Sequence, residues 1–275
     1  MSLPLIPASH SAGLAFDRLA EHYDEVFTES HIGRTQRDAV WSVMHRTFLP
    51  GARILELNCG TGEDALSLAR RGITVLACDA SAGMIAVANR RCAQEVPSPS
   101  DKAQFKVLPT EKLVELQPLG RFDGVLSNFS GFNCVADIPE AARQLSMLVK
   151  TGAPMLLCLS TRICLWEVLW FVFHGQFTKA FRRWKGHASA KIEGIDVTVS
   201  YPILRSLKKS FAPWFTLRSC IGIGVTVPPS YVERWVRRHP GLLRALTAVD
   251  KVVCRWPLFR VTGDHMLLVL ERTAS

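Results

Sequence analysis

The fold of this chain is decided by one stretch, Ile54-Leu55-Glu56-Leu57-Asn58-Cys59-Gly60-Thr61-Gly62-Glu63-Asp64-Ala65. A short apolar run opens it, two glycines lie in a turn, and a helical pattern follows. One helix later comes Thr74-Val75-Leu76-Ala77-Cys78-Asp79. This order predicts a strand, a tight turn, a helix and a second strand that ends in a carboxylate. Gly60 and Gly62 allow a sharp turn and let backbone N–H groups come close to a ligand.

Two nucleotide-type ligands compete for this turn. The pattern Gly60-x-Gly62-x-x-Ala65 fits a dinucleotide fingerprint, and Asp79 can accept the hydroxyls of a ribose in either case. Glu63 and Asp64 occupy the first helical turn, where their charges would repel a pyrophosphate. Glu56 suits a ligand that carries an ammonium and a sulfonium. The local charge therefore argues against the dinucleotide.

The same stretch resembles motif I and the following acidic position of class I S-adenosylmethionine-dependent methyltransferases, usually written E/D-x-G-x-G-x-G. Asn58 stands where the motif has its first glycine, and asparagine tolerates left-handed backbone better than most residues. The resemblance implies an α/β fold with a Rossmann-like seven-stranded sheet, mostly parallel with its last strand antiparallel. It also implies S-adenosyl-L-methionine as cofactor. The alternative is an ordinary parallel α/β turn without a ligand.

Several side chains are expected to bind the cofactor because of this resemblance. Tyr23, in an A-x-x-Y-D pattern, and Arg34 would hold its methionine end, Arg34 by pairing with the carboxylate. As alternatives, Tyr23 would be a packing aromatic, Arg34 a surface charge and Met84 a core methionine. The full expected set is Tyr23, Arg34, Glu56, Asn58, Gly60, Gly62, Asp79, Ala80, Met84, Thr110, Glu111, Asn128 and Phe129.

The catalytic group is harder to identify. Asn128 and Phe129 resemble motif IV, at the carboxyl end of the sheet where open α/β sheets bind ligands. Asn128 can orient an acceptor by hydrogen bonding but cannot act as a base. His265, Tyr201 and His22 are candidate bases, although a structural role is the commoner explanation for any one histidine. No spacing of histidines and carboxylates suggests a metal site.

The domain organisation follows from the order of the expected elements. Residues 1–160, 201–227 and 259–275 are expected to form the methyltransferase core, and 161–200 and 228–258 to form two cap insertions. The expected strands are 54–57, 74–79, 105–108, 121–129 (including the exit from the strand), 155–160, 215–227 and 263–272, and the expected helices are 35–48, 81–95, 139–148 and 201–211. We also expect a loose lead-in at 1–13, a loop at 96–100, a hairpin within 191–199 and two helices within 228–258. Eight cysteines without a C-x-x-C pair indicate reduced thiols packed as small hydrophobes.

The net charge of +9 is uneven along the chain. Residues 1–160 carry 15 Lys and Arg against 17 Asp and Glu, a net of −2, whereas 161–275 carry 18 against 7, a net of +11. Within the basic part, Ile163–Phe173 is apolar except for Glu167, and basic residues follow it. Eleven residues are too few to span a bilayer, which needs about 20. Three interpretations stay open: a helix in a membrane interface, a lid over an apolar substrate, or part of the core.

These observations favour methyl transfer by in-line displacement to an apolar small-molecule or lipid-like acceptor. A nucleic-acid methyltransferase is a less favoured alternative, because the signature for flipped bases is replaced by Ser127-Asn128-Phe129-Ser130. A cofactor-binding or membrane-associated protein without turnover is the third hypothesis. The N-terminus lacks a signal-peptide pattern, so we expect a cytoplasmic location, with peripheral membrane contact through 163–185 under the first interpretation of that segment. The acceptor and the oligomeric state do not follow from the sequence.

Overall fold

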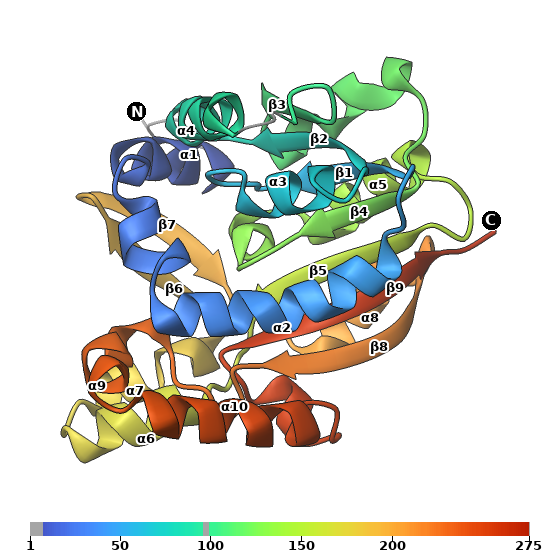
Figure 1. Cartoon of the computed structure of the whole chain (residues 1–275). Helices are drawn as coiled ribbons and strands as arrows, with labels where there is room; N and C mark the ends of the chain where they lie inside the picture. Colours follow the sequence, from blue (N-terminus) through green and yellow to red (C-terminus); the bar gives the residue numbers. More distant parts are fainter. Residues whose placement is uncertain (1–7, 96–98, 275) are drawn as a thin grey trace, which may run out of the picture.

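The computed structural model of this protein describes residues 8–95 and 99–274. Its centre is a sheet of seven strands in the order β3-β2-β1-β4-β5-β9-β8 (Figure 1). The strands are β1 (Arg53–Leu57), β2 (Thr74–Asp79), β3 (Ala103–Val107), β4 (Gly124–Ser127), β5 (Pro154–Ser160), β8 (Phe215–Ile223) and β9 (His265–Arg272). Strand β9 runs antiparallel to both neighbours, and the other described pairs of this sheet are parallel. The predicted fold class is confirmed.

Helices cover both faces of this sheet. They are α1 (Ala8–Leu19), α2 (His31–Thr47), α3 (Glu63–Ala69), α4 (Ala82–Gln94), α5 (Ile138–Leu148) and α8 (Leu204–Phe211). Successive strand residues point to opposite faces, so Ile54 packs with α2 and α3 while Leu55 packs with α5 and α8. Short helical segments lie between them: η1 (Asp24–Thr28), η2 (Thr110–Leu119) and η3 (Gly131–Cys134).

The two insertions gather mostly at one end of the molecule, beside β8 and β9 (Figure 1). The first contains α6 (Leu165–Phe173), α7 (Phe177–Ala180), η4 (Arg182–Lys185) and a hairpin of β6 (His187–Ile192) and β7 (Ile195–Ser200). The second contains η5 (Ser230–Val232), α9 (Glu233–Arg238) and α10 (Pro240–Val253), and η6 (Phe259–Val261) follows it. The hairpin of the first insertion packs against α1. No described helix is long and apolar enough to cross a membrane.

Some element boundaries differ from the prediction. Residues 8–13 are helical rather than loose, and residues 1–7 and 96–98 of the expected lead-in and loop lie outside the described part. Strand β8 ends at Ile223, because Gly224 turns the chain with φ +65°. Helix α8 begins at Leu204 rather than Tyr201, whose N–H instead donates to Gly186.

The described cysteines are free thiols, and most are buried. Burial raises the pKa of Cys158 and of Cys164 to about 12. These thiols stay protonated at neutral pH and pack as small hydrophobes.

Candidate functional site

The turn between β1 and α3 has the left-handed backbone that its sequence requires. Asn58, Gly60 and Gly62 have φ of +53°, +54° and +80°. A Cβ on Gly60 would meet nothing within 4 Å, but one on Gly62 would lie 2.7 Å from the Phe105 ring and 3.0 Å from Ala88. Gly60 therefore opens onto free space, whereas Gly62 permits close packing of α3 against β3 and α4.

Asp79 lies at the carboxyl end of β2 and faces this turn. Its Oδ2 accepts a hydrogen bond from the Gly60 N–H and its Oδ1 accepts one from the Ser81 N–H, both at 2.9 Å. Burial raises the pKa of Asp79, and these backbone bonds oppose that rise. Each carboxylate oxygen keeps a further lone pair, so the group can still accept hydroxyls of a ligand.

A cavity lies at the carboxyl ends of β1, β2 and β4. The expected site residues that line it are Tyr23, Asn58, Gly60, Asp79, Ala80, Met84, Thr110, Asn128 and Phe129. Four others do not line it. Arg34 and Glu111 are exposed to solvent, Gly62 serves packing as described above, and Glu56 lies buried within β1.

The guanidinium in the cavity comes from Arg37, which the sequence interpretation missed. Arg37 donates to Asp64 at 2.7 Å, and its Cζ lies 4.9 Å from the centre of the Phe129 ring. Asp64 also accepts from the Asn128 amide at 2.9 Å. The signal was present in α2: the buried positions Val40 and Met44 place residue 37, and not residue 34, on the inner face of the helix.

The acidic residues at the start of α3 are both neutralised. Asp64 pairs with Arg37, and Glu63 pairs with Arg91 from α4. They do not present free negative charge to a ligand, so the charge argument against a dinucleotide loses its force.

Phe129 occupies a strained position behind β4. Its φ is +43°, and its N–H donates to the Asn128 side chain at 2.9 Å. The ring meets Phe27 and His265 edge-on, with centroids 5.0 Å and 5.5 Å away. Asn128 is therefore used to hold Phe129 and Asp64 in place.

None of the three candidate bases lines the cavity. His265 is buried behind Phe129, and its Nδ1 has no hydrogen-bond partner. Tyr201 is buried, and the centre of its ring lies 5.4 Å from the Arg183 guanidinium carbon. His22 lies on the surface near Glu25. Within the described residues, no group of three His, Cys, Asp or Glu side chains could hold a metal ion.

The remaining wall of the cavity is apolar and comes from elements distant in sequence. Phe16 of α1, Val135 after η3, and Ile192 and Val199 of the hairpin all line it. Val197, two residues before Val199 on β7, is fully buried and packs in one cluster with residues of α1. The sequence predicts the hairpin, but its position beside the cavity is a finding of the structure.

Residues 54–152 match a family model described as a methyltransferase domain. The chain is 32% identical over 151 residues to a demethylmenaquinone methyltransferase of Symbiobacterium thermophilum, covering 50% of this chain and 54% of that protein. It is 31% identical over 147 residues to a 2-phytyl-1,4-naphtoquinone methyltransferase of Trichormus variabilis, covering 50% and 59%. Residues 54–152 form a methyltransferase domain, and the fold is that of S-adenosylmethionine-dependent methyltransferases. The match spans little more than half the length of these relatives.

Solved structures share the fold of this methyltransferase domain across the whole chain. The cyclase SpnF aligns with a TM-score of 0.63 at 16% identity, covering 100% of this chain and 99% of that one. Geranyl diphosphate C-methyltransferase from Streptomyces coelicolor A3(2) aligns with a TM-score of 0.59 at 13% identity, covering 99% and 100%.

The residues of the methyltransferase domain fit its cofactor, S-adenosylmethionine. Glu56 lies two residues before Asn58, which lines the cavity. The Oε2 of Glu56 is buried without a hydrogen-bond partner, and burial raises the pKa of this carboxyl group. A ligand cation near this end of β1 would stabilise its charged form. Arg37 offers a buried guanidinium for a carboxylate, and Asp79 offers acceptors for a ribose.

Proposed function

We propose that the chain transfers a methyl group from S-adenosylmethionine to an apolar small-molecule or lipid-like acceptor. The observation that carries this proposal is the division of one cavity into two walls. Arg37, Asp64 and Asp79 form a polar wall suited to the cofactor, and Phe16 and Val199 belong to an apolar wall. The named relatives are a demethylmenaquinone methyltransferase and a 2-phytyl-1,4-naphtoquinone methyltransferase, and these names support an apolar small-molecule acceptor.

The cofactor supplies an electrophilic methyl group, and the side chains of this chain supply alignment and a water-poor site. Arg37 and Asp79 would fix the two ends of the cofactor. Tyr23 is partly buried where it lines the cavity, and desolvation raises the pKa of its hydroxyl to about 12. Tyr23 therefore stays protonated and can donate a hydrogen bond. No histidine is among the described residues that line the cavity, so the acceptor atom should be nucleophilic without a histidine base.

The other two hypotheses have less support. A nucleic-acid acceptor would need a base-sized polar pocket, and the cavity wall that contains Phe16 is apolar. A protein that binds the cofactor without methyl transfer is consistent with the fold, which a cyclase shares. Activity must therefore be measured directly.

The test uses methyl-labelled S-adenosylmethionine with the purified chain and a lysate of its host. Products are divided into organic-soluble, water-soluble and acid-insoluble fractions. Label in the organic fraction is the expected result. Label in the acid-insoluble fraction would point to a macromolecular acceptor, and no label at saturating cofactor would contradict methyl transfer.

The cofactor site has its own test. Asp79→Ala removes the ribose acceptor, and we expect S-adenosylmethionine to bind roughly a hundredfold more weakly. Asp101→Ala removes an exposed carboxylate from the loop before β3 and serves as the control. Calorimetry measures both affinities, and equal affinities would remove Asp79 from the site.

An acceptor with an apolar tail would be stored in a membrane, and this supports peripheral contact through residues 163–185. The sequence allows three interpretations of that segment: a helix in a membrane interface, a lid over an apolar substrate, or part of the core. The side chains that α6 buries and exposes favour one of them.

A further inference from the structure

Helix α6 has its polarity reversed relative to a helix that packs on a protein core. Glu167 is its one charged residue and its one buried residue, at 1% exposure. Leu169 and Phe173 are 54% and 85% exposed. A soluble helix normally turns its apolar residues inward and its charges outward. This helix therefore leaves large apolar side chains in water, at a cost in free energy.

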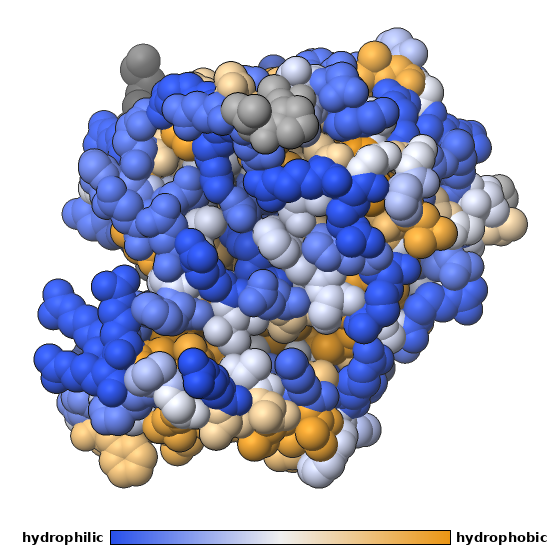
Figure 2. All heavy atoms as spheres, in the orientation of Figure 1, coloured by the Kyte–Doolittle hydropathy of each residue, from blue (hydrophilic) through white to orange (hydrophobic). Residues whose placement is uncertain are grey.

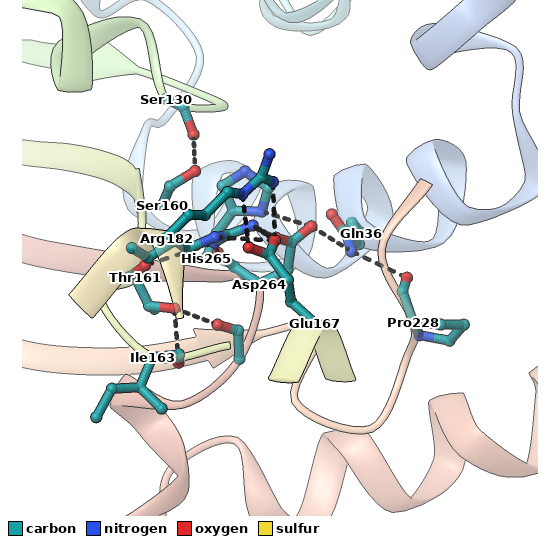
Figure 3. Close-up of polar contacts among 12 residues, drawn as sticks. Gln36, Ser130, Ser160, Thr161, Ile163, Glu167, Arg182, Pro228, Asp264 and His265 are labelled. Atoms are coloured by element: carbon teal, nitrogen blue, oxygen red, sulfur yellow. Dashed lines mark hydrogen bonds and ion pairs between the residues drawn. The ribbon is translucent and has the colours of Figure 1, made fainter. Parts of the chain in front are cut away.

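A buried ion-pair network fixes this orientation. Glu167 accepts from Arg182 Nε at 2.8 Å and from Arg183 at 2.7 Å, and Arg183 also donates to Asp264 at 2.9 Å. Gln36 of α2 donates to Asp264 at 3.4 Å. Figure 3 shows Gln36, Glu167, Arg182 and Asp264 converging between the start of β9, α2 and the first insertion (Figure 3). The network holds the polar side of α6 against the core, so its apolar side must face out.

Helix α10, in the second insertion, also buries its one acid, here together with Leu243. Asp250 is buried and accepts from the Thr226 N–H at 2.7 Å. On the same helix, Val249 and Val252 are 48% and 63% exposed. Leu258, just beyond α10, is 70% exposed. Two insertions that are separate in the sequence thus present apolar side chains outward while Glu167 and Asp250 are buried.

Direct contacts join the two insertions into one end of the molecule. The ring of Tyr231 lies 5.3 Å from that of Phe171, and Trp166 Nε1 donates to the Thr226 carbonyl at 2.7 Å. Thr226 also binds Asp250 of α10, as described above. We call the exposed apolar side chains of residues 163–184 and 231–258 the apolar end. Figure 2 shows apolar residues along this edge of the molecule, with hydrophilic residues beside them over α9 (Figure 2).

The charge of the chain is concentrated at the same end. Residues 161–186 and 228–262 carry 12 Lys and Arg against 3 Asp and Glu, a net of +9, which equals the net charge of the whole chain. The three acids are Glu167, Glu233 and Asp250, and each is hydrogen-bonded within the protein. Exposed cations such as Arg234 and Arg238 therefore have few acids nearby to neutralise them.

We infer that the apolar end docks on a lipid bilayer surface that carries anionic headgroups. Trp184, Trp235 and Trp256 are each at least 38% exposed there, and tryptophan is favoured at membrane interfaces. A nine-residue helix is about 14 Å long, which suits a helix lying in the plane of the interface. Arginines beside the inserted side chains would meet the headgroups.

A second copy of the chain fits this end less well. Two identical surfaces with a net charge of +9 each would face one another in a symmetric dimer and repel. A nucleic acid would satisfy the charges but would leave Phe173 and Leu258 in water. The inference does not rest on methyl transfer, because binding to vesicles is measured without acceptor or cofactor.

The first experiment measures co-sedimentation of the full chain with phosphatidylcholine vesicles, with and without phosphatidylglycerol. We expect binding only to the anionic vesicles. The double variant Phe173→Ser, Leu258→Ser should bind roughly tenfold more weakly, because both side chains are largely exposed and free to enter the bilayer. The control is Leu49→Ser, Leu119→Ser, which removes exposed leucines outside the apolar end and should bind like the parent chain.

The second experiment tests the charges. Arg234→Gln, Arg238→Gln should weaken binding to anionic vesicles by about fivefold for each arginine. Lys208→Gln, Lys209→Gln on α8 removes the same charge from elsewhere and should have a much smaller effect. Tryptophan fluorescence of the parent chain should shift to the blue on vesicle binding, because three of the seven tryptophans lie at the apolar end.

Several results would overturn the inference. Equal binding of the Phe173→Ser, Leu258→Ser variant and its control would remove the apolar end from the contact. A dimer of the free chain that this variant abolishes would assign the surface to a second copy. Displacement from vesicles by RNA that binds more tightly would assign it to a nucleic acid.

Discussion

At the scale of single residues, the polar wall depends on the pair of Arg37 and Asp64. Arg37→Gln would leave Asp64 buried without its ion pair, and losing one partner of such a pair costs about 3–5 kcal/mol. We expect the free energy of unfolding in urea to fall by that order. Arg34→Gln, one turn away and exposed, should change it by less than about 0.5 kcal/mol. Similar losses in both variants would contradict the assignment of Arg37 to the inner face of α2.

His265 gives the stability a pH dependence. Burial lowers its pKa, although the nearby Asp264 carboxylate opposes this. The unfolded chain, with a histidine pKa of about 6.5, then binds a proton that the folded chain does not. The stability that His265 contributes should be fully present above about pH 6.5 and should be lost as the pH falls below that value toward the lowered pKa of the folded state. His265→Gln should flatten this slope in urea titrations, and the exposed His187→Gln should leave it unchanged.

At the scale of elements, the hairpin supplies part of the acceptor wall. Val199 lines the cavity, whereas Thr198 faces solvent on the other side of β7. Val199→Asp would place a charge on the apolar wall, and we expect the KM for the acceptor to rise at least about tenfold. Calorimetry should show nearly unchanged cofactor affinity. Thr198→Asp is the matched control, and an equal effect there would place the acceptor elsewhere.

The elements also show how far sequence reasoning reaches. Strands β1 and β2 and the turn between them could be predicted because their signals are local: an apolar run, glycines and a carboxylate at fixed spacing. The part played by α1 and the hairpin could not, because Phe16 and Val199 meet only through long-range packing. Arg34 was predicted from the resemblance alone, whereas the helical spacing of the buried residues in α2 places Arg37 on the inner face.

At the scale of the whole molecule, the network around Glu167 joins the first insertion to the sheet. Glu167→Gln would weaken its bonds with Arg182 and Arg183, at a cost of roughly 3 kcal/mol. In hydrogen exchange, the amides of α6 should exchange faster while those of β4 keep their rates. Glu140→Gln, which removes an exposed pair with Arg143 on α5, is the control. Unchanged exchange in α6 would show that its contacts with Tyr231 alone hold it in place.

The position of β9 has a consequence for how the protein is made. This strand lies between β5 and β8 but leaves the ribosome after both of them. While residues 224–264 are being synthesised, β5 and β8 each have a backbone edge that awaits the same missing neighbour. Until β9 has been synthesised, the nascent chain therefore exposes two unpaired strand edges and the apolar end, and all three could associate with other chains. Binding of a chaperone or a membrane to the nascent chain would protect it during this interval.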